Sequence, residues 1–389
     1  MSGNWSKYKL EDISLIIAGQ SPNSDTYNFD KNGLPFFQGK ADFGSVSPTP
    51  KVWCSNPIKI AEKDDILLSV RAPVGPTNIA AEKCCIGRGL CAIRVNNNVN
   101  MKFVYFFFKL FEKDISQMGS GSTFSAITNE DVKNLEIYLP PLEEQERIVK
   151  IIEKKLTAVE KAETASVEQI VNVNSLFPLK LKKYLNNKRW KNYKLIELCD
   201  YFNDGNWIET KDQSKSGIRL IQTGNIGNGI YLDKPDVAKY ISEDTFNKLN
   251  CSEVYPNDIL ISRLPKPVGR ACIVPDLNTK MITAVDCTIV RVNKQICDHR
   301  FLLYILMSDF YFNQVNLFLA GSTRERISRS NLESIKVNLT SLDEQQLIIN
   351  QLEKENNIIN KLSKFCVLQS VYINALPSSI LRKAFNGDY

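Results

Sequence analysis

Histidine is almost absent from this sequence, which holds one, His299, among 389 residues. The ten cysteines show no CxxC spacing, so a zinc site would need a nearly all-thiolate ligand set, and we expect free thiols. His299 follows Asp298 at an expected helix start, which favours a structural role. No apolar run approaches the roughly 20 residues of a membrane span. The start, MSGNWSKYKLED, has no apolar signal-peptide core, so we expect a cytoplasmic protein without membrane contact.

Motifs of catalysis and cofactor binding are also missing. There is no GxxxxGK[ST] phosphate loop, no HExxH or GxSxG, and no NPP[FY]-type tetrapeptide of adenine methyltransferases. The glycine-rich TGNIGNG (223–229) does not read GxGxxG and is interpreted as a turn. PDVAK (235–239) and PDLNTK (275–280) lack the spaced carboxylates of a metal-dependent nuclease. The sequence therefore predicts a binding protein without catalytic residues, metal or cofactor of its own.

Positive charge is modest and unevenly placed. A net charge of +6 and a pI near 8.6 permit nucleic-acid binding without demanding it, since dedicated basic domains usually lie above about 9. The stretch 180–194, KLKKYLNNKRWKNYK, holds seven Lys or Arg and no acid. Two readings stay open for it, a solvated linker face and a contact with phosphates or an acidic partner.

An internal repeat organises the whole sequence. Motifs of the first half return in the same order 185 to 200 residues later. The pairs are WSKYKLEDI (5–13) and WKNYKLIEL (190–198), PFFQGKADFG (35–44) and RLIQTGNIGNG (219–229), DDILLSVRAPVG (64–75) and NDILISRLPKPVG (257–269), CAIRVN (91–96) and TIVRVN (288–293), GSTFSAI (121–127) and GSTRERI (321–327), LPPLEEQERIV (139–149) and LTSLDEQQLII (339–349), and LKKYLN (181–186) and LRKAFN (381–386). The period exceeds that of solenoid repeats, so each copy should be a domain plus a helical arm.

Within each copy, short β-branched or aromatic segments bounded by Pro, Gly and Asn indicate strands. They are DILLSV, CAIRV and LEIYLP in the first copy, and DILISR, CTIVRV and IKVNL in the second. One strongly apolar helix is expected in each copy, at 103–115 and at 301–315. We expect an α+β protein with two similar, mixed and mostly antiparallel β-rich domains, followed by helical spacers. The expected bounds are 1–141 and 190–341 for the domains, and 142–189 and 342–389 for the spacers.

The spacer sequences carry the heptad seam of a coiled coil rather than the broader stripe of a core helix. The a and d positions are Leu142, Val149, Ile152, Leu156, Val159, Ile170, Val173 and Phe177, and then Leu342, Ile349, Leu352, Ile359 and Ile373. Polar residues interrupt both seams, which disfavours a long homodimer zipper; they are Glu163, Ser166, Asn356, Ser363 and Ser370. Equivalent units exchange equivalent helices about a pseudo-twofold axis, so we expect the two helices to pair as an antiparallel coiled coil.

The ends of both helices can also be placed. Pro140 and Pro141 suit a first helical turn, and the acidic residues that follow match the helix macrodipole. Thr340 or Ser341 supplies a cap for the second helix. Prolines 178 and 377 are expected to interrupt the far ends.

The ordered double set of motifs resembles the specificity subunit of type I restriction–modification enzymes. It consists, twice over, of a W..YKL opening, a DILLS-like strand followed by a PVG turn, a GST…I loop, and P-L-EEQ-x-I leading into a long helix. The terminal LPSSILRKAFNGDY (376–389) fits as well, so the resemblance covers essentially the whole chain. It implies a non-catalytic subunit whose two target recognition domains each read half of a bipartite double-stranded DNA target, with the paired helices as spacer.

The resemblance also implies partners. Two methyltransferase subunits, which hold S-adenosylmethionine and methylate adenine, dock along the helices, and motor-nuclease subunits join in complexes that cut unmodified DNA. An arm over 142–177 would be about 54 Å long if wholly helical, which suits two readers roughly one duplex turn apart. Because the two copies differ outside their framework, the target should be asymmetric.

Base reading requires Arg, Lys, Asn or Gln side chains presented from loops. The DNA-binding candidates are Gln38, Lys40, Arg71, Arg88, Ser122 and Thr123 in the first domain, and Gln222, Asn225, Arg263, Lys266, Arg270, Ser322, Thr323, Arg324 and Arg326 in the second. Arg71 and Arg263 are interpreted as alike in position, each offered outward by the turn after a matched strand. Arg94 and Arg291 lie inside expected strands and should be structural.

The two GST loops depart from the family pattern in different ways. The first, GSGSTFSAI, lacks the glutamine or asparagine expected after GST. The second, GSTRERI, places Arg324, Arg326 and Arg329 close together and supports DNA contact better, with arginines on a solvated loop as the alternative. Two other functions stay open, a free-standing sequence-specific DNA-binding regulator and a helical scaffold without a DNA role.

Overall fold

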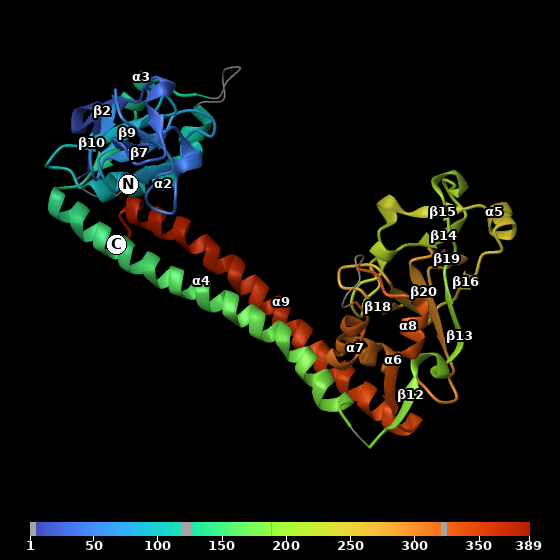
Figure 1. Ribbon diagram of the computed structural model, residues 1–389. Helices are drawn as coiled ribbons and strands as arrows, with labels where there is room; N and C mark the ends of the chain where they lie inside the picture. Colours follow the sequence, from blue (N-terminus) through green and yellow to red (C-terminus); the bar gives the residue numbers. More distant parts are fainter. Residues whose placement is uncertain (1–4, 119–125, 188, 320–324) are drawn as a thin grey trace. The chain divides into compact units, whose positions relative to one another are not determined.

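The described part of the chain, residues 5–118, 126–187, 189–319 and 325–389 of a computed structural model, is α+β (Figure 1). It divides into two compact units. Unit 1 comprises Met1–Val167 with Leu368–Tyr389, and unit 2 comprises Glu168–Val367. Each unit holds one β-rich domain together with parts of both long helices, as the internal repeat predicts.

Unit 1 contains three sheets and three short or medium helices before the first long helix. Its strands are β1 (Ser6–Lys9), β2 (Ser14–Ala18), β3 (Tyr27–Asn28), β4 (Leu34–Phe37), β5 (Trp53–Cys54), β6 (Ile60–Ala61), β7 (Ile66–Ser69), β8 (Thr77–Ile79), β9 (Cys84–Ile86), β10 (Leu90–Val95) and β11 (Glu136–Leu139). Its helices are α1 (Leu10–Ile13), α2 (Met101–Met118), α3 (Asn129–Lys133) and the first part of α4 (Leu142–Leu185).

Unit 2 has a similar element order, with a 3-10 helix (Leu195–Leu198) in the place of α1, an added helix α5, and two helices, α6 and α7, in the place of α2. Its strands are β12 (Lys191–Lys194), β13 (Cys199–Asp204), β14 (Ile218–Ile221), β15 (Lys239–Ile241), β16 (Glu253–Val254), β17 (Ile259–Ser262), β18 (Ala271–Ile273), β19 (Met281–Thr283), β20 (Cys287–Val292) and β21 (Lys336–Leu339). Its helices are α5 (Glu243–Lys248), α6 (His299–Leu306), α7 (Asp309–Leu319), α8 (Arg329–Ser334) and the first part of α9 (Leu342–Asn386).

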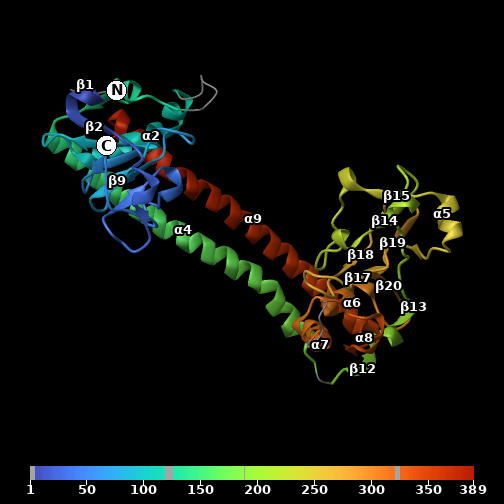
Figure 2. The same cartoon turned by 45° about the horizontal axis from the view of Figure 1, so that its top comes forward.

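Two sheets of unit 1 correspond strand by strand to two sheets of unit 2. The order β2-β10-β7-β8 in unit 1 matches β13-β20-β17-β18 in unit 2, and β1-β11 matches β12-β21. The remaining sheets, β3-β5-β4-β9-β6 and β15-β14-β19-β16, each contain one parallel pair, β4 with β9 and β14 with β19. The mixed, mostly antiparallel domains expected from the sequence are therefore confirmed. In both views, the β15-β14-β19-β16 sheet lies at the end of unit 2 away from α6, α7 and β12 (Figures 1 and 2).

The central strands β7 and β17 are buried on both faces, which explains their uninterrupted apolar sequence. Ile66 and Leu68 of β7 pack with the phenylalanines of α2, whereas Leu67 points to the other sheet and packs with Phe37 and Ile86. In unit 2 the two faces of β17 likewise belong to two core clusters, one shared with α6 and the other with β14 and β19. Each domain is thus a helix layer and two sheet layers.

The prediction of one continuous apolar helix in unit 2 is wrong. The apolar segment 301–315 is two helices, α6 and α7, which are separated at Ser308. The Ser308 hydroxyl donates to the carbonyl oxygen of Ile305 at 2.6 Å and accepts from the N–H of Tyr311 at 3.4 Å. A buried side chain that bonds to both flanking helices ends the first and caps the second. The corresponding α2 of unit 1 is continuous, as expected.

The long helices α4 and α9 pair in antiparallel fashion within each unit. In unit 1, Ile148 and Ile152 near the start of α4 share a core with Leu381 and Phe385 near the end of α9. In unit 2, where the end of α4 meets the first part of α9, Lys180 forms an ion pair with Glu355 at 2.7 Å, and Tyr184 donates to Glu355 at 2.9 Å. The expected antiparallel coiled coil is confirmed.

Two details of the expected helices are wrong. Pro178 and Pro377 lie inside α4 and α9, which continue to Leu185 and Asn386. The apolar residues beyond the prolines are buried against the domains, and this packing outweighs one lost backbone hydrogen bond. The first expected seam positions, Leu142 and Leu342, are 37% and 40% exposed, so the buried seam begins one heptad later, at Val149 and Ile349. Ser341 caps α9, since its hydroxyl accepts from the N–H of Glu344 at 3.4 Å.

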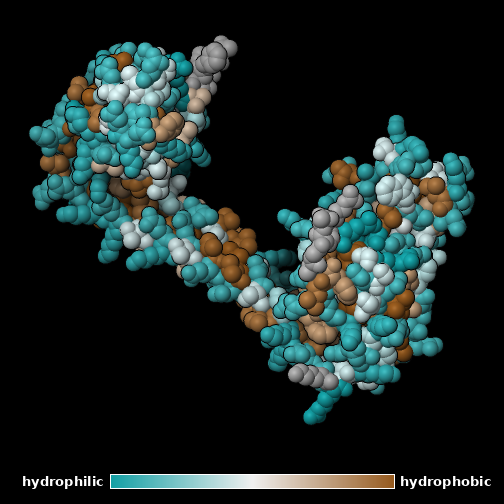
Figure 3. Space-filling model, viewed as in Figure 1, coloured by the Kyte–Doolittle hydropathy of each residue, from teal (hydrophilic) through white to brown (hydrophobic). Residues whose placement is uncertain are grey.

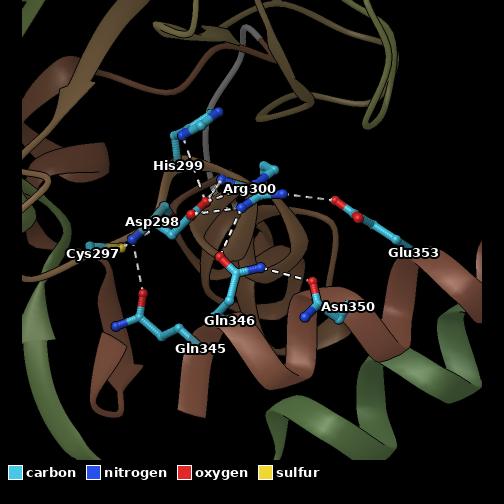
Figure 4. Close-up of polar contacts among 8 residues, drawn as sticks. All are labelled: Cys297, Asp298, His299, Arg300, Gln345, Gln346, Asn350 and Glu353. Carbon is cyan, nitrogen blue, oxygen red and sulfur yellow. Dashed lines mark hydrogen bonds and ion pairs between the residues drawn. The ribbon is translucent and has the colours of Figure 1, made fainter. Parts of the chain in front are cut away.

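The glutamine of each helix-start motif fastens its helix to the domain of the same unit. Gln345 is fully buried and accepts from the N–H of Asp298 at 2.9 Å (Figure 4). It also donates to the carbonyl oxygens of Ile296 at 3.0 Å and Thr340 at 2.8 Å. Beside it, Arg300 bonds to Asp298 and to side chains of α9 (Figure 4).

In unit 1 the matched Gln145 is 2% exposed. It accepts from the N–H of Asn100 at 2.9 Å and donates to the carbonyl oxygen of Pro140 at 2.8 Å. We call Gln145 and Gln345 the glutamine clasps. They fix the direction in which each helix leaves its domain.

Candidate nucleic-acid interface

Four loops of unit 1 meet at one edge, where β2, β4, β7 and β9 end. We call this region the loop edge of unit 1; it comprises residues 19–22, 38–44, 70–76 and 87–89. Backbone hydrogen bonds join the loops, from Gly19 N–H to Leu90 O at 2.9 Å, from Gly87 N–H to Phe37 O at 2.8 Å, and from Val70 N–H to Gly89 O at 3.0 Å. Segments far apart in the sequence are thereby held against one another.

Two glycines make this close approach possible. A Cβ on Gly87 would lie 3.2 Å from the Cα of Gln38, and one on Gly89 would lie 2.3 Å from its carbonyl oxygen. Arg88, between them, is exposed, and its N–H donates to the hydroxyl of Ser21 at 3.4 Å. The tight backbone contact therefore brings the chain segments that carry two exposed residues, Arg88 and Gln38, against each other.

The other candidates of unit 1 join this edge. Lys40 is exposed in a single turn of 3-10 helix two residues after Gln38, and Asp42 holds that turn by accepting from the Gln38 N–H at 2.7 Å. Arg71 is exposed and forms an isolated bridge with Ala126. Ser122 and Thr123, in the chain that leads to this bridge, lie outside the described residues. The structure thus gathers Gln38, Lys40, Arg71 and Arg88 on one surface, and their contact with DNA stays a prediction.

Unit 2 forms the same edge with matched backbone bonds. Its loop edge comprises residues 205–208, 222–230, 263–269, 284–286 and 325–328. The bonds run from Gly205 N–H to Cys287 O at 2.9 Å, from Ala284 N–H to Ile221 O at 3.0 Å, and from Arg263 N–H to Asp286 O at 2.9 Å. The two edges are therefore equivalent in backbone and differ in side chains.

The expectation that Arg71 and Arg263 are alike in position is wrong by one residue. The N–H of Ile127 donates to Val70 O at 3.0 Å in unit 1, and the N–H of Ile327 donates to Arg263 O at 3.2 Å in unit 2. Arg263 therefore corresponds to Val70. Because strand side chains alternate between faces, a shift of one residue turns the arginine inward.

Arg263 is 5% exposed and holds the inside of the edge together. Its guanidinium lies 3.1 Å from a carboxylate oxygen of Asp204 and donates to the carbonyl oxygen of Val285 at 2.7 Å. Burial lowers the pKa of Arg263, and the Asp204 charge opposes that shift. The expectation that the turn offers this side chain outward is wrong.

Two further candidates of unit 2 are also buried rather than presented. Arg270 is 8% exposed and donates to four backbone carbonyls, those of Thr223, Ile226, Leu264 and Pro267. Asn225 is 6% exposed, accepts from the Gln222 N–H at 3.0 Å and donates to Leu232 O at 3.0 Å. Both side chains satisfy the loop backbone, which explains why this polar segment adopts one shape.

The remaining candidates of unit 2 lie at the surface. Lys266 is exposed and Gln222 is half-buried. Arg326 is exposed but forms an ion pair with Asp286 at 2.9 Å, and Arg329 forms one with Glu333 at 3.2 Å. Ser322, Thr323 and Arg324 lie outside the described residues. The sequence gives no periodic signal for Asp204 and Asp286, whose carboxylates neutralise part of this edge.

The two strand arginines are structural, as expected. Arg94 donates to Asp65 at 2.9 and 2.8 Å, and Arg291 donates to Asp258 at 2.9 and 2.8 Å. Hydrogen bonding to Asp65 raises the pKa of Arg94, against the opposing effect of burial. Each ion pair links the start of a central strand, β7 or β17, to the strand paired with it, β10 or β20.

Other sequence features do not contribute to the loop edges. The ten cysteines are free thiols, and burial raises the pKa of Cys84 to about 12. Among the described residues, no three His, Cys, Asp or Glu gather as a metal site. His299 is the first residue of α6, and burial lowers its pKa. In the basic stretch, Lys180 is paired with Glu355 and Lys191 lies over the ring of Tyr193. No described helix could cross a membrane.

A family model described as the type I restriction modification DNA specificity domain matches residues 2–169 and 187–365. The chain belongs to this specificity-domain family. The domain occurs twice, and each match covers one recognition domain with most of the helix that follows. The double match agrees with the internal repeat and with the matched loop edges.

Relatives in the family cover different parts of the chain. The MjaX specificity subunit of Methanocaldococcus jannaschii is 44% identical over 160 residues, which is 40% of this chain and 37% of that relative. The MjaVIII specificity subunit of the same organism is 23% identical over 88% of this chain and 84% of its own length. The EcoBI specificity subunit of Escherichia coli is 23% identical over 99% of this chain and 86% of its own length.

Solved structures share the fold. A chain from work on complex assembly and conformational transition of the type I R-M system matches with a TM-score of 0.77 at 20% identity, over 100% of this chain and 99% of that one. The HsdS subunit of Thermoanaerobacter tengcongensis matches with a TM-score of 0.66 at 20% identity, over 100% and 98%. These likenesses show a common specificity-subunit fold.

Proposed function

We propose that this protein is the non-catalytic DNA-specificity subunit of a type I restriction–modification complex. Each recognition domain reads one half of an asymmetric bipartite target in double-stranded DNA. The observation that carries the proposal is the pair of loop edges, which share their backbone hydrogen bonds and differ in their exposed side chains. Family membership supports the same reading.

The first loop edge suits direct readout of base edges. Arginine recognises guanine through two parallel hydrogen bonds, and glutamine recognises adenine in the same manner. Gln38, Arg71 and Arg88 supply these groups from loops that are fixed by backbone bonds. Preorganised loops place such donors without a large ordering cost on binding. We therefore assign base reading to Gln38, Arg71 and Arg88, and a phosphate contact to Lys40.

The second loop edge suits a different half-site. Lys266, Gln222 and Arg326 face the surface there, while Arg263 and Arg270 are committed to the interior. Two readers with different exposed groups recognise different base pairs, so the target is not a palindrome. The long helices, fastened by the glutamine clasps, set the separation of the half-sites.

The partners of the long helices are methyltransferase subunits. α9 exposes large apolar side chains at helical spacing in each unit. They are Ile358, Leu362 and Phe365 in unit 2, and Leu368, Tyr372 and Leu376 in unit 1. At the positions that match the three residues of unit 2, 200 residues earlier, α4 has the small alanines Ala158, Ala162 and Ala165. Apolar side chains gather visibly on the paired helices (Figure 3). An apolar stripe on a long helix is typical of a surface that another protein covers.

The division of labour follows from this arrangement. Two methyltransferase subunits, one for each half of the repeat, bring S-adenosylmethionine and methylate adenine, and this chain selects the site. Motor-nuclease subunits complete the complex where unmodified DNA is cut. The protein works in the cytoplasm, where its DNA target lies.

The decisive experiment combines co-purification with methylation mapping. The chain is co-expressed with the methyltransferase subunit of the same operon, the complex is purified, and N6-methyladenine is mapped in the host genome. The expected result is a stable complex and one asymmetric bipartite motif. Tight specific DNA binding by the chain alone, without a methyltransferase, would indicate a free-standing regulator. Binding without salt dependence, or no DNA binding by the complex, would indicate a scaffold.

A domain exchange tests the assignment of half-sites. Replacing residues 14–95 with the equivalent segment of another family member keeps α2 and the end of α9, which complete the core of unit 1. We expect one half-site to change and the other to stay the same. Replacement of residues 199–292 is the matched control and should change the opposite half-site. A change in both half-sites from either exchange contradicts the assignment.

A further inference from the structure

A tryptophan on the second loop edge lies outside the hydrophobic core clusters found among the described residues of unit 2. Trp207 is 68% exposed, whereas the next residue, Ile208, packs against the core of the β15-β14-β19-β16 sheet. The alternation of strand-like backbone thus turns one side chain in and the large indole out. Tryptophan is enriched at recognition surfaces, which makes this exposed side chain on a fixed loop a candidate binding residue.

The backbone around Trp207 is held rigidly. A Cβ on Gly205 would lie 2.2 Å from the carbonyl oxygen of Thr283, so the loop approaches β19 as closely as only glycine allows. The N–H of Asn206 donates to that same oxygen at 3.0 Å, and its side chain accepts from the N–H of Ser252 at 2.8 Å. The indole is therefore presented from a fixed point.

The position of Trp207 corresponds to the centre of the first loop edge. Gly205 matches Gly19 by its bond to the start of the next central strand, so Trp207 matches Ser21. In unit 1, Ser21 contacts the backbone of Arg88, the exposed guanidinium of that edge. In unit 2, the residue that matches Arg88 is Val285, which is half-buried. The second edge thus has an indole in place of Ser21, and a valine in place of the exposed cation.

The charges around Trp207 favour a base contact over a phosphate contact. The indole N–H donates to Glu209 at 3.4 Å, and Glu209 forms an ion pair with Lys211 at 2.7 Å. The nearby arginines 263 and 326 are paired with their own carboxylates. Lys211, Arg263 and Arg326 are thus each paired with a carboxylate, which favours a contact of the indole ring with a base over a contact with the DNA backbone.

We propose that Trp207 is the apolar base contact of the second recognition domain, packing on the C5-methyl group of a thymine in the major groove. This inference rests on the proposed function, because it requires that the second loop edge faces DNA. The thymine methyl is the apolar feature that distinguishes an A·T pair in the major groove. The first domain reads its half-site mainly by hydrogen bonds, and the second adds this apolar contact.

The test uses the purified complex with methyltransferase and a duplex that carries the mapped target. Trp207→Ala should weaken specific binding about tenfold. Replacing the contacted thymine by uracil removes the C5-methyl group and should weaken wild-type binding by a similar factor. The same replacement should have little further effect on Trp207→Ala, since both changes remove one interaction. Trp207→Phe should restore part of the affinity.

Arg88→Ala is the matched control on the other edge. It should weaken binding in the first half-site and leave the response to uracil in the second half-site unchanged. The salt dependence of binding should be unaltered in Trp207→Ala, because the indole releases no counterions.

Trp207→Ala binding within twofold of wild type would overturn the inference, as would additive effects of the two changes or a second half-site without an A·T pair. A wild-type complex that binds no bipartite site would instead refute the proposed function itself.

Discussion

The glutamine clasp of unit 2 supports a quantitative prediction. Gln345→Ala removes three hydrogen bonds of 2.8 to 3.0 Å made by a fully buried side chain, and it takes this partner from the N–H of Asp298 and from two carbonyls, all of half-buried residues. Each lost bond contributes about 1 kcal/mol, and an unsatisfied buried group costs about 1 to 3 kcal/mol. We expect a loss of roughly 3 to 5 kcal/mol in the free energy of unfolding of unit 2.

The matched clasp of unit 1 sets the expected order of effects. Gln145 makes two such bonds instead of three, so Gln145→Ala should cost roughly 2 to 3 kcal/mol in unit 1. Gln169→Ala, at an exposed position of α4 in unit 2, is the control and should be nearly neutral. The difference between variants isolates burial and bonding from the loss of a glutamine on a long helix.

Hydrogen exchange followed by mass spectrometry separates the units. Amides of α6 and of the start of α9 report on unit 2, and amides of α2 report on unit 1. A loss of 3 kcal/mol corresponds to roughly a hundredfold faster exchange of amides that open with the whole unit. The reasoning is refuted if Gln345→Ala changes exchange in unit 2 by less than twofold, or if Gln145→Ala has the larger effect.

Three further predictions address single contacts. Asp258→Asn breaks the two-bond pair with Arg291 and should cost about 1.5 to 3 kcal/mol, measured by urea unfolding; an unchanged midpoint contradicts the structural role. Hydrogen bonds from its lysine, glutamine and tyrosine partners hold the pKa of Glu355 at about 2, below the ordinary 4.5. Its contribution to stability is therefore present above pH 4.5 and is lost as the pH falls toward 2. In Glu355→Gln, the melting temperature should depend less on pH between pH 4.5 and 2 than it does in the wild type. Gly75→Ala places a Cβ 2.6 Å from a carbonyl of α2 at φ 106° and should cost at least about 2 kcal/mol, whereas Gly39→Ala, which meets nothing within 4 Å, should cost far less by the same denaturation.

The architecture was predictable because it depends on local periodicity and on repetition. Strands such as β7 and β17 stand out as short apolar runs between turn residues, and the heptad seam identifies α4 and α9. The repeat then shows that one domain occurs twice, and the equivalence of Arg94 and Arg291 follows from their matched strands. None of these inferences requires knowledge of which distant residues touch.

The candidate site was only partly predictable, because it depends on register and on pairing across loops. A shift of one residue exchanges the inside and outside of a strand, and the extra residue in the second PVG turn hid the correspondence of Arg263 with Val70. The carboxylates of Asp204 and Asp286 pair across loops with no sequence periodicity. The glutamine clasps carry a signal, since the same glutamine recurs in both helix starts, but acidic neighbours suggested a capping role instead.

The division of the long helices between the units has a consequence for synthesis of the chain. Unit 2 is contiguous, Glu168–Val367, whereas the core of unit 1 includes Leu381 and Phe385 from the last helical turns. At about 5 to 20 residues per second, the ribosome reaches Leu381 roughly 12 to 48 s after it has made the first domain, which ends near residue 141. The domain translated first therefore completes its core last, and it waits with an open apolar face of α2 until the C-terminal helix emerges.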